Sequence, residues 1–156
     1  MWSNGFGKLL STLLISMVPV VELRGAIPAA LAQGVPAIPA ALVSIVGNLL
    51  PVPFIIVFVR RVFAWIRHKM PKLDGFVSRL EQRAEAKSES VRKYSFWGLF
   101  LFVAIPLPGT GAWTGALIAA MLEMRLKHAL PAIILGVLTA AVIVTLASLG
   151  VIHLVL

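Results

Sequence analysis

Residues 19–28 read PVVELRGAIP, and this stretch decides how the rest of the chain is interpreted. Glu22 and Arg24 place a carboxylate and a guanidinium inside sequence that is otherwise as apolar as a membrane interior. An ionisable side chain at membrane depth is costly and usually serves a function. The two prolines and the glycine disfavour a regular helix, so we expect an irregular loop here. Such a loop is tolerated at membrane depth only where protein or a water-filled cavity surrounds it.

The composition is that of an integral membrane protein with a single domain. Of the 156 residues, 60% are hydrophobic and 13% are charged, and the mean hydropathy is +0.98. A soluble domain is about half apolar and about a quarter charged. The formal net charge of +8 does not indicate a nucleic-acid partner, because most basic residues are confined to residues 60–93. The sequence contains no cysteine, which excludes disulfides and thiolate chemistry.

Two segments are long and apolar enough to cross a membrane. Residues 38–59 carry no charge, and residues 129–152 form a second such run, whereas a span needs about 20 apolar residues. Pro51 and Pro53 predict a kink in the first span. Asn48 lies inside that span, so we expect its side chain to face protein or a cavity rather than lipid.

Each long span follows a pair of short apolar runs that are separated by a break. Residues 9–35 contain the break at Glu22, and residues 96–124 contain a second break with the sequence PLPGTG. Each run is too short to cross a bilayer, which is typical of re-entrant segments. Laid over each other, GAIPAAL at 25–31 and GALIAAM at 115–121 share four of seven residues. This match indicates an internal repeat, with a first copy over residues 9–59 and a second over residues 96–152.

Two topologies are compatible with this repeat. If each pair of short runs is one broken spanning helix, the basic cluster at 125–128 lies opposite residues 60–93. If each pair is a re-entrant hairpin, each half crosses once and the two clusters share one side, an arrangement that the positive-inside rule favours. We therefore expect an all-α integral membrane protein of two inverted repeats. Each repeat would be a re-entrant helical hairpin plus one transmembrane helix, and a cytoplasmic amphipathic helix would join the two.

That joining helix is predicted over residues 60–93, with apolar side chains on one face. Arg79, Arg83 and Lys87 flank the apolar face, where basic side chains can reach lipid phosphates. We expect this segment to lie on the anionic cytoplasmic leaflet of the cell (inner or plasma) membrane, in a multi-pass protein. The alternative is a helix packed on protein with a solvated charged face.

Two motifs carry a family resemblance. ELRGAIP at 22–28 and PLPGTGAWTGALIAA at 106–120 resemble the motifs of the small multidrug export proteins, which are short bacterial and archaeal membrane proteins. More distantly, the hairpin-plus-span repeat is similar to the DedA, or VTT-domain, superfamily. That likeness implies lipid translocation, including that of the undecaprenyl phosphate carrier, and proton-dependent transport. The second DedA hairpin carries arginines around its proline, but Ala104 to Trp113 contain none, so a phosphate-binding role does not transfer to this loop.

The candidate substrate- or proton-binding residues gather at the two breaks and in the first span. Glu22 is a candidate proton or cation site, and Arg24 could bind an anionic headgroup or lock Glu22; alternatively, the two neutralise each other and hold the hairpin. The second break offers backbone amides and hydroxyls to an anion, or else close helix packing through its glycines. Trp113 is a candidate gate, or simply a core residue. The full set is Glu22, Arg24, Gly25, Pro28, Asn48, Pro106, Pro108, Gly109, Thr110, Gly111, Trp113 and Thr114.

We expect a DedA-like, proton-coupled transporter or lipid translocase for an anionic lipid such as a polyprenyl phosphate or a phospholipid, because Arg24 suits an anion. The alternatives are a small multidrug or cation exporter that uses Glu22 as its proton site, and a non-transporting membrane scaffold. We expect no enzymatic activity, cofactor, metal or nucleic-acid partner, since ligand spacings and a GxxxxGK[ST] loop are missing from the sequence. A homodimer is a further expectation, because one copy buries little protein surface.

Overall fold

The computed structural model describes residues 4–79, 82, 96–107, 110–122 and 124–155, and every element within these ranges is helical. Two stretches, Ala37–Lys69 and Leu126–Val155, are long and apolar enough to cross a membrane. The elements are α1 (Gly5–Met17), α2 (Glu22–Ala32), α3 (Ala37–Leu49), α4 (Val52–Lys69), the 3₁₀ helix η1 (Pro71–Leu73), α6 (Phe96–Ala104), α7 (Ala112–Met121) and α8 (Leu126–Val155).

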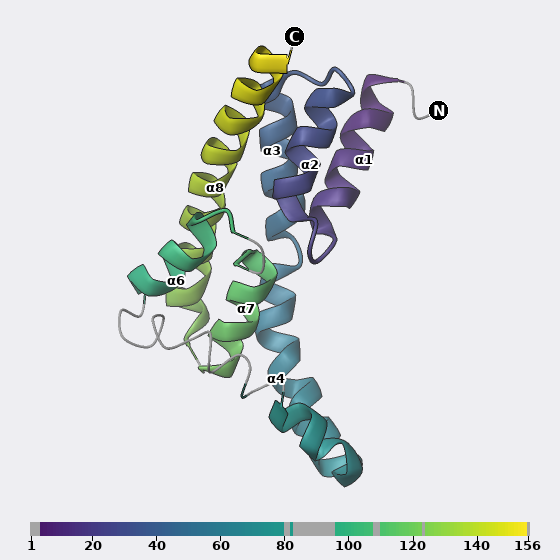
Figure 1. Cartoon of the computed structure of the whole chain (residues 1–156). Coiled ribbons are helices and arrows are strands. Elements are labelled where there is room, and N and C mark those ends of the chain that lie inside the picture. The colour runs from purple at the N-terminus through teal and green to yellow at the C-terminus, as the bar shows by residue number, and fades with distance from the viewer. Residues whose placement is uncertain (1–3, 80–81, 83–95, 108–109, 123, 156) are drawn as a thin grey trace.

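Two helical hairpins pack against the two long helical stretches (Figure 1). The hairpin of α1 and α2 lies at the end that holds both chain termini, and the hairpin of α6 and α7 lies in the other half. The first arm of each hairpin packs on the long helix that follows it, α1 on α3 and α6 on α8. The second arms contact both halves, α2 through α3 and α8, and α7 through α4 and α8. As a result, the turns of the two hairpins face each other near the middle of the molecule.

The stretch 19–28 is mostly helical, so the expectation of an irregular loop is wrong for most of it. The irregular part is limited to residues 18–21, where Val20 has a φ of 88°, and Glu22 begins α2 with a φ of 50°. The helix then runs through Pro28. It forms because tertiary burial outweighs weak intrinsic propensity, and the buried apolar residues of α2 are Leu23, Ala26, Ile27 and Ala30.

The chain leaves α2 through a Schellman motif built on Gly34, whose φ is 80°. The amide of Gly34 donates to the carbonyl of Leu31 and the amide of Val35 donates to that of Ala30, each at 3.0 Å. Val35 and Ala30 are buried together with Ala40 in a small core cluster. The motif thus turns the chain back so that α3 runs antiparallel to α2.

The first long helix continues beyond the boundary predicted from sequence. The sequence predicts a span over residues 38–59, but α4 runs on to Lys69. Residues 60–69 are therefore the end of α4 rather than the start of a separate amphipathic helix. The cations Arg67 and Lys69 lie in its last turn, where the helix dipole favours positive charge. The predicted kink corresponds to the break between α3 and α4 at residues 50–51.

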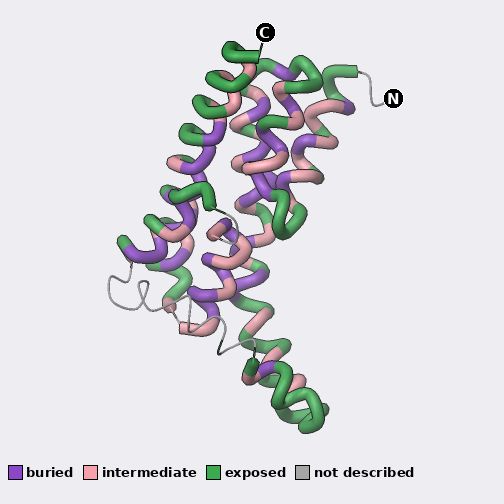
Figure 2. The backbone as a smooth tube through the Cα atoms, in the orientation of Figure 1, coloured by how far each residue is buried: buried purple, intermediate pink, exposed green. Residues whose placement is uncertain are grey.

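The core follows the seam between the hairpins and the long helices (Figure 2). Val103 of α6 occupies a hole between Gly115 of α7 and Gly136 of α8. A methyl group at Gly115 or Gly136 would come within 2.6 or 2.7 Å of the Val103 side chain, respectively. Small residues that let helices approach closely are the usual means of helix association in membranes.

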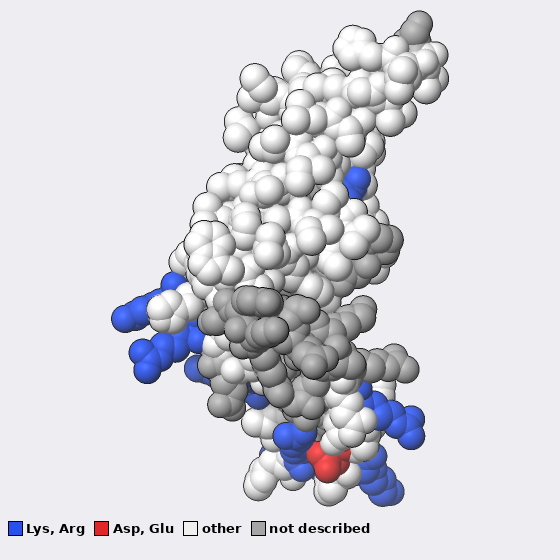
Figure 3. Space-filling model, turned by 60° about the vertical axis from the view of Figure 1, so that its left-hand side comes forward, with Lys and Arg blue, Asp and Glu red and all other residues white. Residues whose placement is uncertain are grey.

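In the view of Figure 3, charged side chains are sparse over most of the surface and gather at one end. Large apolar side chains such as Leu42, Leu138 and Val142 are exposed on α3 and α8, as expected for helices that contact lipid rather than water. Lys and Arg side chains gather toward the end opposite the chain termini. Arg125 and Lys127, at the start of α8, lie at the same end as the last turns of α4.

Candidate functional site

The turns of the two hairpins meet at a site that we call the tip junction, formed by Glu22, Arg24, Thr110, Gly111 and Trp113. Both charges belong to the first turn of α2, and Nη1 of Arg24 donates to Oε2 of Glu22 at 2.9 Å. Residues two apart normally face different sides of a helix, but Glu22 is the first residue of α2 and has a left-handed backbone. The side chain of Glu22 is 4% exposed and that of Arg24 is 19% exposed, so the ion pair is largely removed from solvent.

Glu22 caps the helix of the opposite hairpin. Its Oε1 accepts a hydrogen bond of 3.1 Å from the backbone N–H of Trp113, the second residue of α7. The first amides of a helix have no partner within the helix, and its dipole favours a negative charge at that end. A methyl group at Gly111 would overlap the Glu22 carboxylate. Only glycine at this position therefore leaves room for the carboxylate to reach α7.

Arg24 also binds the second hairpin, at backbone carbonyls at and after the end of its first arm, α6. Its Nη2 lies 3.1 Å from the carbonyl of Thr110, 3.2 Å from that of Ile105 and 3.4 Å from that of Val103. These carbonyls lie at and beyond the end of α6, where helical partners run out and where the dipole favours a cation. Each charge of the pair thus stabilises an end of one helix in the opposite hairpin, and the two hairpins are joined through both.

Thr110 and Trp113 hold the second hairpin in the shape that receives these charges. The hydroxyl of Thr110 donates to the carbonyl of Leu107 at 2.7 Å and accepts a hydrogen bond from the amide N–H of Leu107 at 3.2 Å. The indole N–H of Trp113 donates to the carbonyl of Met17 at the end of α1, at 3.1 Å. Trp113 therefore contacts both arms of the first hairpin, which makes it a fixed part of the junction in this conformation.

The other residues predicted from sequence lie outside these contacts. Asn48 is buried on α3, and its Oδ1 has no hydrogen-bond partner among the described residues. Gly25 packs against Val21 within the first turns of α2. Pro28, Pro106 and the interfacial candidate Arg79 are exposed, while Thr114 is half-buried. Pro108, Gly109, Arg83 and Lys87 lie outside the described residues.

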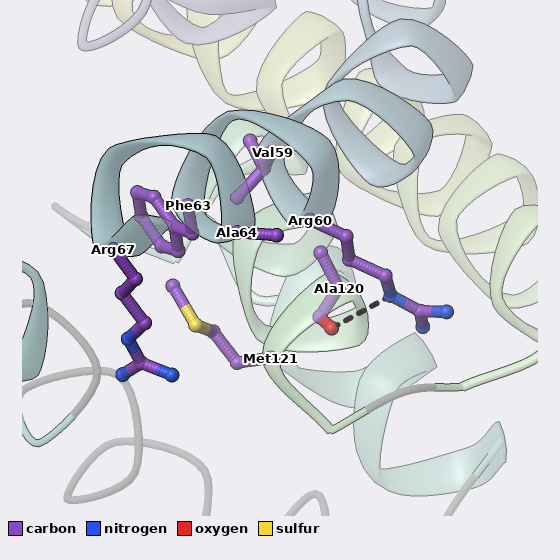
Figure 4. A pocket seen from close by; sticks show the side chains of 7 residues that line it. All are labelled: Val59, Arg60, Phe63, Ala64, Arg67, Ala120 and Met121. Carbon is purple, nitrogen blue, oxygen red and sulfur yellow. Dashed lines mark hydrogen bonds between the residues drawn. The ribbon is translucent and has the colours of Figure 1, made fainter. Parts of the chain in front are cut away.

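A second guanidinium, which the sequence did not single out, closes the far end of α7. Arg60 of α4 donates through Nε to the carbonyl of Ala120 at 2.9 Å and through Nη2 to that of Met124 at 3.0 Å. It borders a cavity of about 240 Å³ between α4 and α7, with Phe63 and Met121 on its walls (Figure 4). From the sequence, Arg60 can be identified only as the charged residue at the end of a membrane span. The neighbouring residues in the sequence do not predict which backbone carbonyls it binds.

Within the described ranges, no group of three or more His, Asp or Glu residues is arranged to hold a metal ion. The charged side chains of the tip junction are one carboxylate and one guanidinium, and both contact helix ends of the second hairpin.

A family model described as "Putative small multi-drug export protein" matches residues 22–143, which begin at Glu22 and include the whole tip junction. No curated protein and no solved structure gives a significant match to the chain. The match covers most of the chain, and it agrees with the resemblance carried by ELRGAIP and PLPGTGAWTGALIAA.

Proposed function

The chain belongs to the family of small multi-drug export proteins, which indicates a membrane transporter, and from this premise we propose a proton-coupled carrier of anionic lipids. In this proposal the tip junction is the coupling site, and the protein is a multi-pass protein of the cell membrane. The observation that carries the proposal is the buried Glu22–Arg24 pair, which joins helix ends of both hairpins. The likeness to the DedA superfamily stays a hypothesis.

The lengths of the hairpin arms support a re-entrant arrangement. The arms α1, α2, α6 and α7 contain 13, 11, 9 and 10 residues. At about 1.5 Å per residue they are about 14–20 Å long, or roughly half of the ~30 Å hydrocarbon core. Two hairpins that enter from opposite faces would bring their tips together near the midplane. Transporters built from inverted repeats with broken helices bind substrate at that depth.

Protonation of Glu22 would weaken the junction. Ionised Glu22 attracts both the Arg24 guanidinium and the N-terminal amides of α7, and a neutral carboxyl loses most of both attractions. Arg24 is then left as a largely buried cation without a counter-charge, which is strongly unfavourable. An anionic group that binds Arg24 removes this penalty. Proton and anion therefore favour each other's binding, and the hairpins are freed to separate only when both are present.

Arg24 retains the means to bind an anion. Its Nε is buried and has no hydrogen-bond partner within the described residues. Protonation of Glu22 would free Nη1 as well, so that N–H groups on both Nε and Nη1 could donate to a phosphate. This supports a phosphate-bearing headgroup as the substrate part that enters the junction.

The lipid-facing surface offers room for the apolar part of such a substrate. A groove of about 300 Å³ runs between α3 and α8, and its lining includes Ile38, Leu42 and Leu138. A second groove of about 410 Å³ lies between α1 and α3, where Phe6 and Leu10 line it. Both are apolar, and acyl or prenyl chains fit such surfaces. Together they favour a polyprenyl phosphate or a phospholipid over a small soluble anion.

The test is flux in sealed liposomes that contain the purified protein. A pH gradient should drive movement of a fluorescent anionic phospholipid between leaflets, and a zwitterionic analogue should move more slowly. Arg24→Ala should abolish the movement, while Glu22→Gln should remove its dependence on the gradient. Arg61→Ala, which removes an exposed arginine of α4, is the matched control and should behave as wild type. Unchanged flux in both junction variants would contradict the proposal.

A second candidate function is export of a cationic drug in exchange for protons. It is favoured by the family description and by Glu22, the buried carboxylate of the described core. In this case Glu22→Gln should abolish efflux of a lipophilic cation, and Arg24→Ala should leave it intact or increase it. The opposite ranking of the two variants separates the candidates. If neither substrate moves in the wild-type protein, a non-transporting scaffold becomes the better description.

A further inference from the structure

The buried polar side chains are distributed unevenly between the two halves of the protein. Among the described residues, all of them belong to the first hairpin and to α3. The buried side chains of α6 and α7 are apolar apart from glycine, with Leu99, Val103 and Ile118 the largest. The buried polar groups thus lie on the side of the tip junction that leads to the terminal face, next to apolar residues such as Ala30, Val35 and Ala40, and the described buried residues of α6 and α7 add none. The polar set is Thr12, Ser16, Glu22, Ser44 and Asn48.

Two members of this set each carry a polar atom that has no hydrogen-bond partner within the described part of the chain. Ser44 is 0% exposed and Asn48 is 1% exposed, yet Oγ of Ser44 and Oδ1 of Asn48 make no hydrogen bond within the described part of the chain. A buried polar atom without a partner is costly in free energy, and buried water molecules in proteins typically bond to such otherwise unsatisfied groups. By contrast, Thr12 and Ser16 donate to carbonyls of their own helix, those of Lys8 and Leu13, each at 2.7 Å.

The register of α2 and α3 places these two side chains on the way to Glu22. The helices are antiparallel, and Ala30 lies in the same buried cluster as Ala40. One further turn along α3 brings Ser44 level with Ala26, and a second turn brings Asn48 level with Glu22. Ala26, at the level of Ser44, has a small side chain.

The outer end of the seam is formed by α1. Lys8, Thr12 and Ser16 follow each other at spacings of four, so they form one stripe along this helix. Lys8 reaches the carbonyl of Gln33 at the exposed terminal face, at 2.7 Å. At the inner end, the hydroxyl of Ser16 lies against Gly47, the neighbour of Asn48. The stripe thus connects the terminal face to the level of the junction.

We propose that ordered water bridges Ser44 and Asn48 and connects Glu22 to the membrane face that holds both chain termini. In this conformation Glu22 exchanges protons with that face and is closed to the basic face by the apolar core of α6 and α7. Hydroxyl and amide groups both donate and accept hydrogen bonds, so they can bind a row of water molecules between the helices. Arg24 is the charged side chain that meets Glu22 in the junction. The inference rests on the proposed role of Glu22 as the proton site and adds the side from which it is reached.

Accessibility of single cysteines tests the path without any knowledge of the substrate. The chain contains no cysteine, so Ser44→Cys and Asn48→Cys each introduce one thiol. The probe is Ag⁺, which enters paths that admit water but not larger reagents, applied to one side of oriented, sealed proteoliposomes. Thiols that have bound Ag⁺ resist later alkylation in detergent, and this resistance is the readout. Ala116→Cys, at a buried position of α7, is the matched control in the apolar half.

The two thiols should react with Ag⁺ from the terminal face faster than from the basic face by about tenfold or more, a ratio equivalent to about 1.4 kcal/mol. The control thiol should stay unreactive from both faces. Lack of reaction at both seam positions, or faster reaction from the basic face, would overturn the proposal. Thr12→Cys provides a further seam position if Asn48→Cys fails to fold. Each variant is first compared with wild type for its elution and melting temperature.

The outcomes separate this inference from the proposed function. If Ag⁺ reaches the seam but no lipid moves in a Glu22-dependent way, the water path stands and the transport proposal fails. If lipid movement depends on Glu22 and the seam thiols stay unreactive, the transport proposal stands and the path is wrong.

Discussion

At the residue scale, the tip junction depends on where two opposite charges lie relative to helix ends. Glu22 meets the amide end of α7 and Arg24 meets the carbonyls at the end of α6. The pair is thus stabilised by its own attraction and by two helix dipoles of the opposite hairpin. This explains how an ion pair is tolerated where desolvation would otherwise outweigh the attraction between its members.

Gly111→Ala should disrupt the junction without touching either charge. The added methyl group overlaps the Glu22 carboxylate, so the carboxylate must leave α7, and the ion pair with Arg24 is strained. We expect the free energy of unfolding to fall by about 2–4 kcal/mol, from the lost cap and the weakened pair. Thermal or denaturant unfolding in detergent measures the change.

The control for this variant is Gly150→Ala. Nothing lies within 4 Å of a methyl group at Gly150 in α8, so the same substitution should be neutral or stabilising by up to about 1 kcal/mol. Equal loss of stability in the two variants would show that the close approach of Glu22 to α7 is unimportant.

At the element scale, the carbonyls at the C-terminal ends of three short helices bind Lys or Arg side chains from other helices. Lys8 of α1 binds a carbonyl after α2, Arg24 of α2 binds carbonyls at the end of α6, and Arg60 of α4 binds those at the end of α7. The last carbonyls of a helix have no partner within the helix, so side chains or other groups must bind them. Each cation therefore also fixes the position of one hairpin arm.

Arg60→Ala should loosen the end of α7. It removes hydrogen bonds to the carbonyls of Ala120 and Met124, and charged donors contribute about 1.5–3 kcal/mol each at most. Because Arg60 is exposed, we expect a smaller loss of about 1–2 kcal/mol in stability. Amides in the last turn of α7 should exchange with deuterium faster than in wild type.

The comparison variant for this effect is Arg61→Ala. It removes the same charge from the next position of α4, and no hydrogen bond of Arg61 is found in the part of the chain that the structure describes. Amide exchange in α7 should then remain at the wild-type rate. An equal effect of both variants would attribute the change to net charge rather than to the cap.

At the scale of the whole molecule, one end is basic and the other holds both termini (Figure 3). The start of α8 and the end of α4 share the basic end. For a protein whose two long helices each cross the membrane once, this distribution follows the positive-inside rule and predicts a cytoplasmic basic end.

Side-specific labelling tests this topology in whole cells. An impermeant maleimide added outside should modify an Asn4→Cys variant and should not modify Lys69→Cys or Lys127→Cys until the membrane is opened. All three positions are exposed in the folded protein, so lack of reaction reports sidedness rather than burial. Labelling of Lys127→Cys from outside, with Asn4→Cys and Lys69→Cys both protected, would contradict re-entrant hairpins and favour four crossings.

Several features of this protein follow from the sequence by itself. The membrane class, the two long apolar segments, the approximate positions of both breaks and the family can be predicted from the sequence, because hydropathy and turn-forming residues act locally along the chain. The family assignment is confirmed by the model match over residues 22–143. The two inverted repeats and the roles of the candidate site residues stay predictions.

Other features were decided by tertiary structure alone. Local composition argued against a helix at Pro28, and the burial of one face of α2 overrode it. The capping of α7 by Glu22 and the contacts of Arg24 and Arg60 with carbonyls join segments that are far apart in the sequence. Such contacts depend on which helix ends packing brings together. The sequence shows which residues are charged, but the backbone groups that these residues bind are brought to them only when the helices pack.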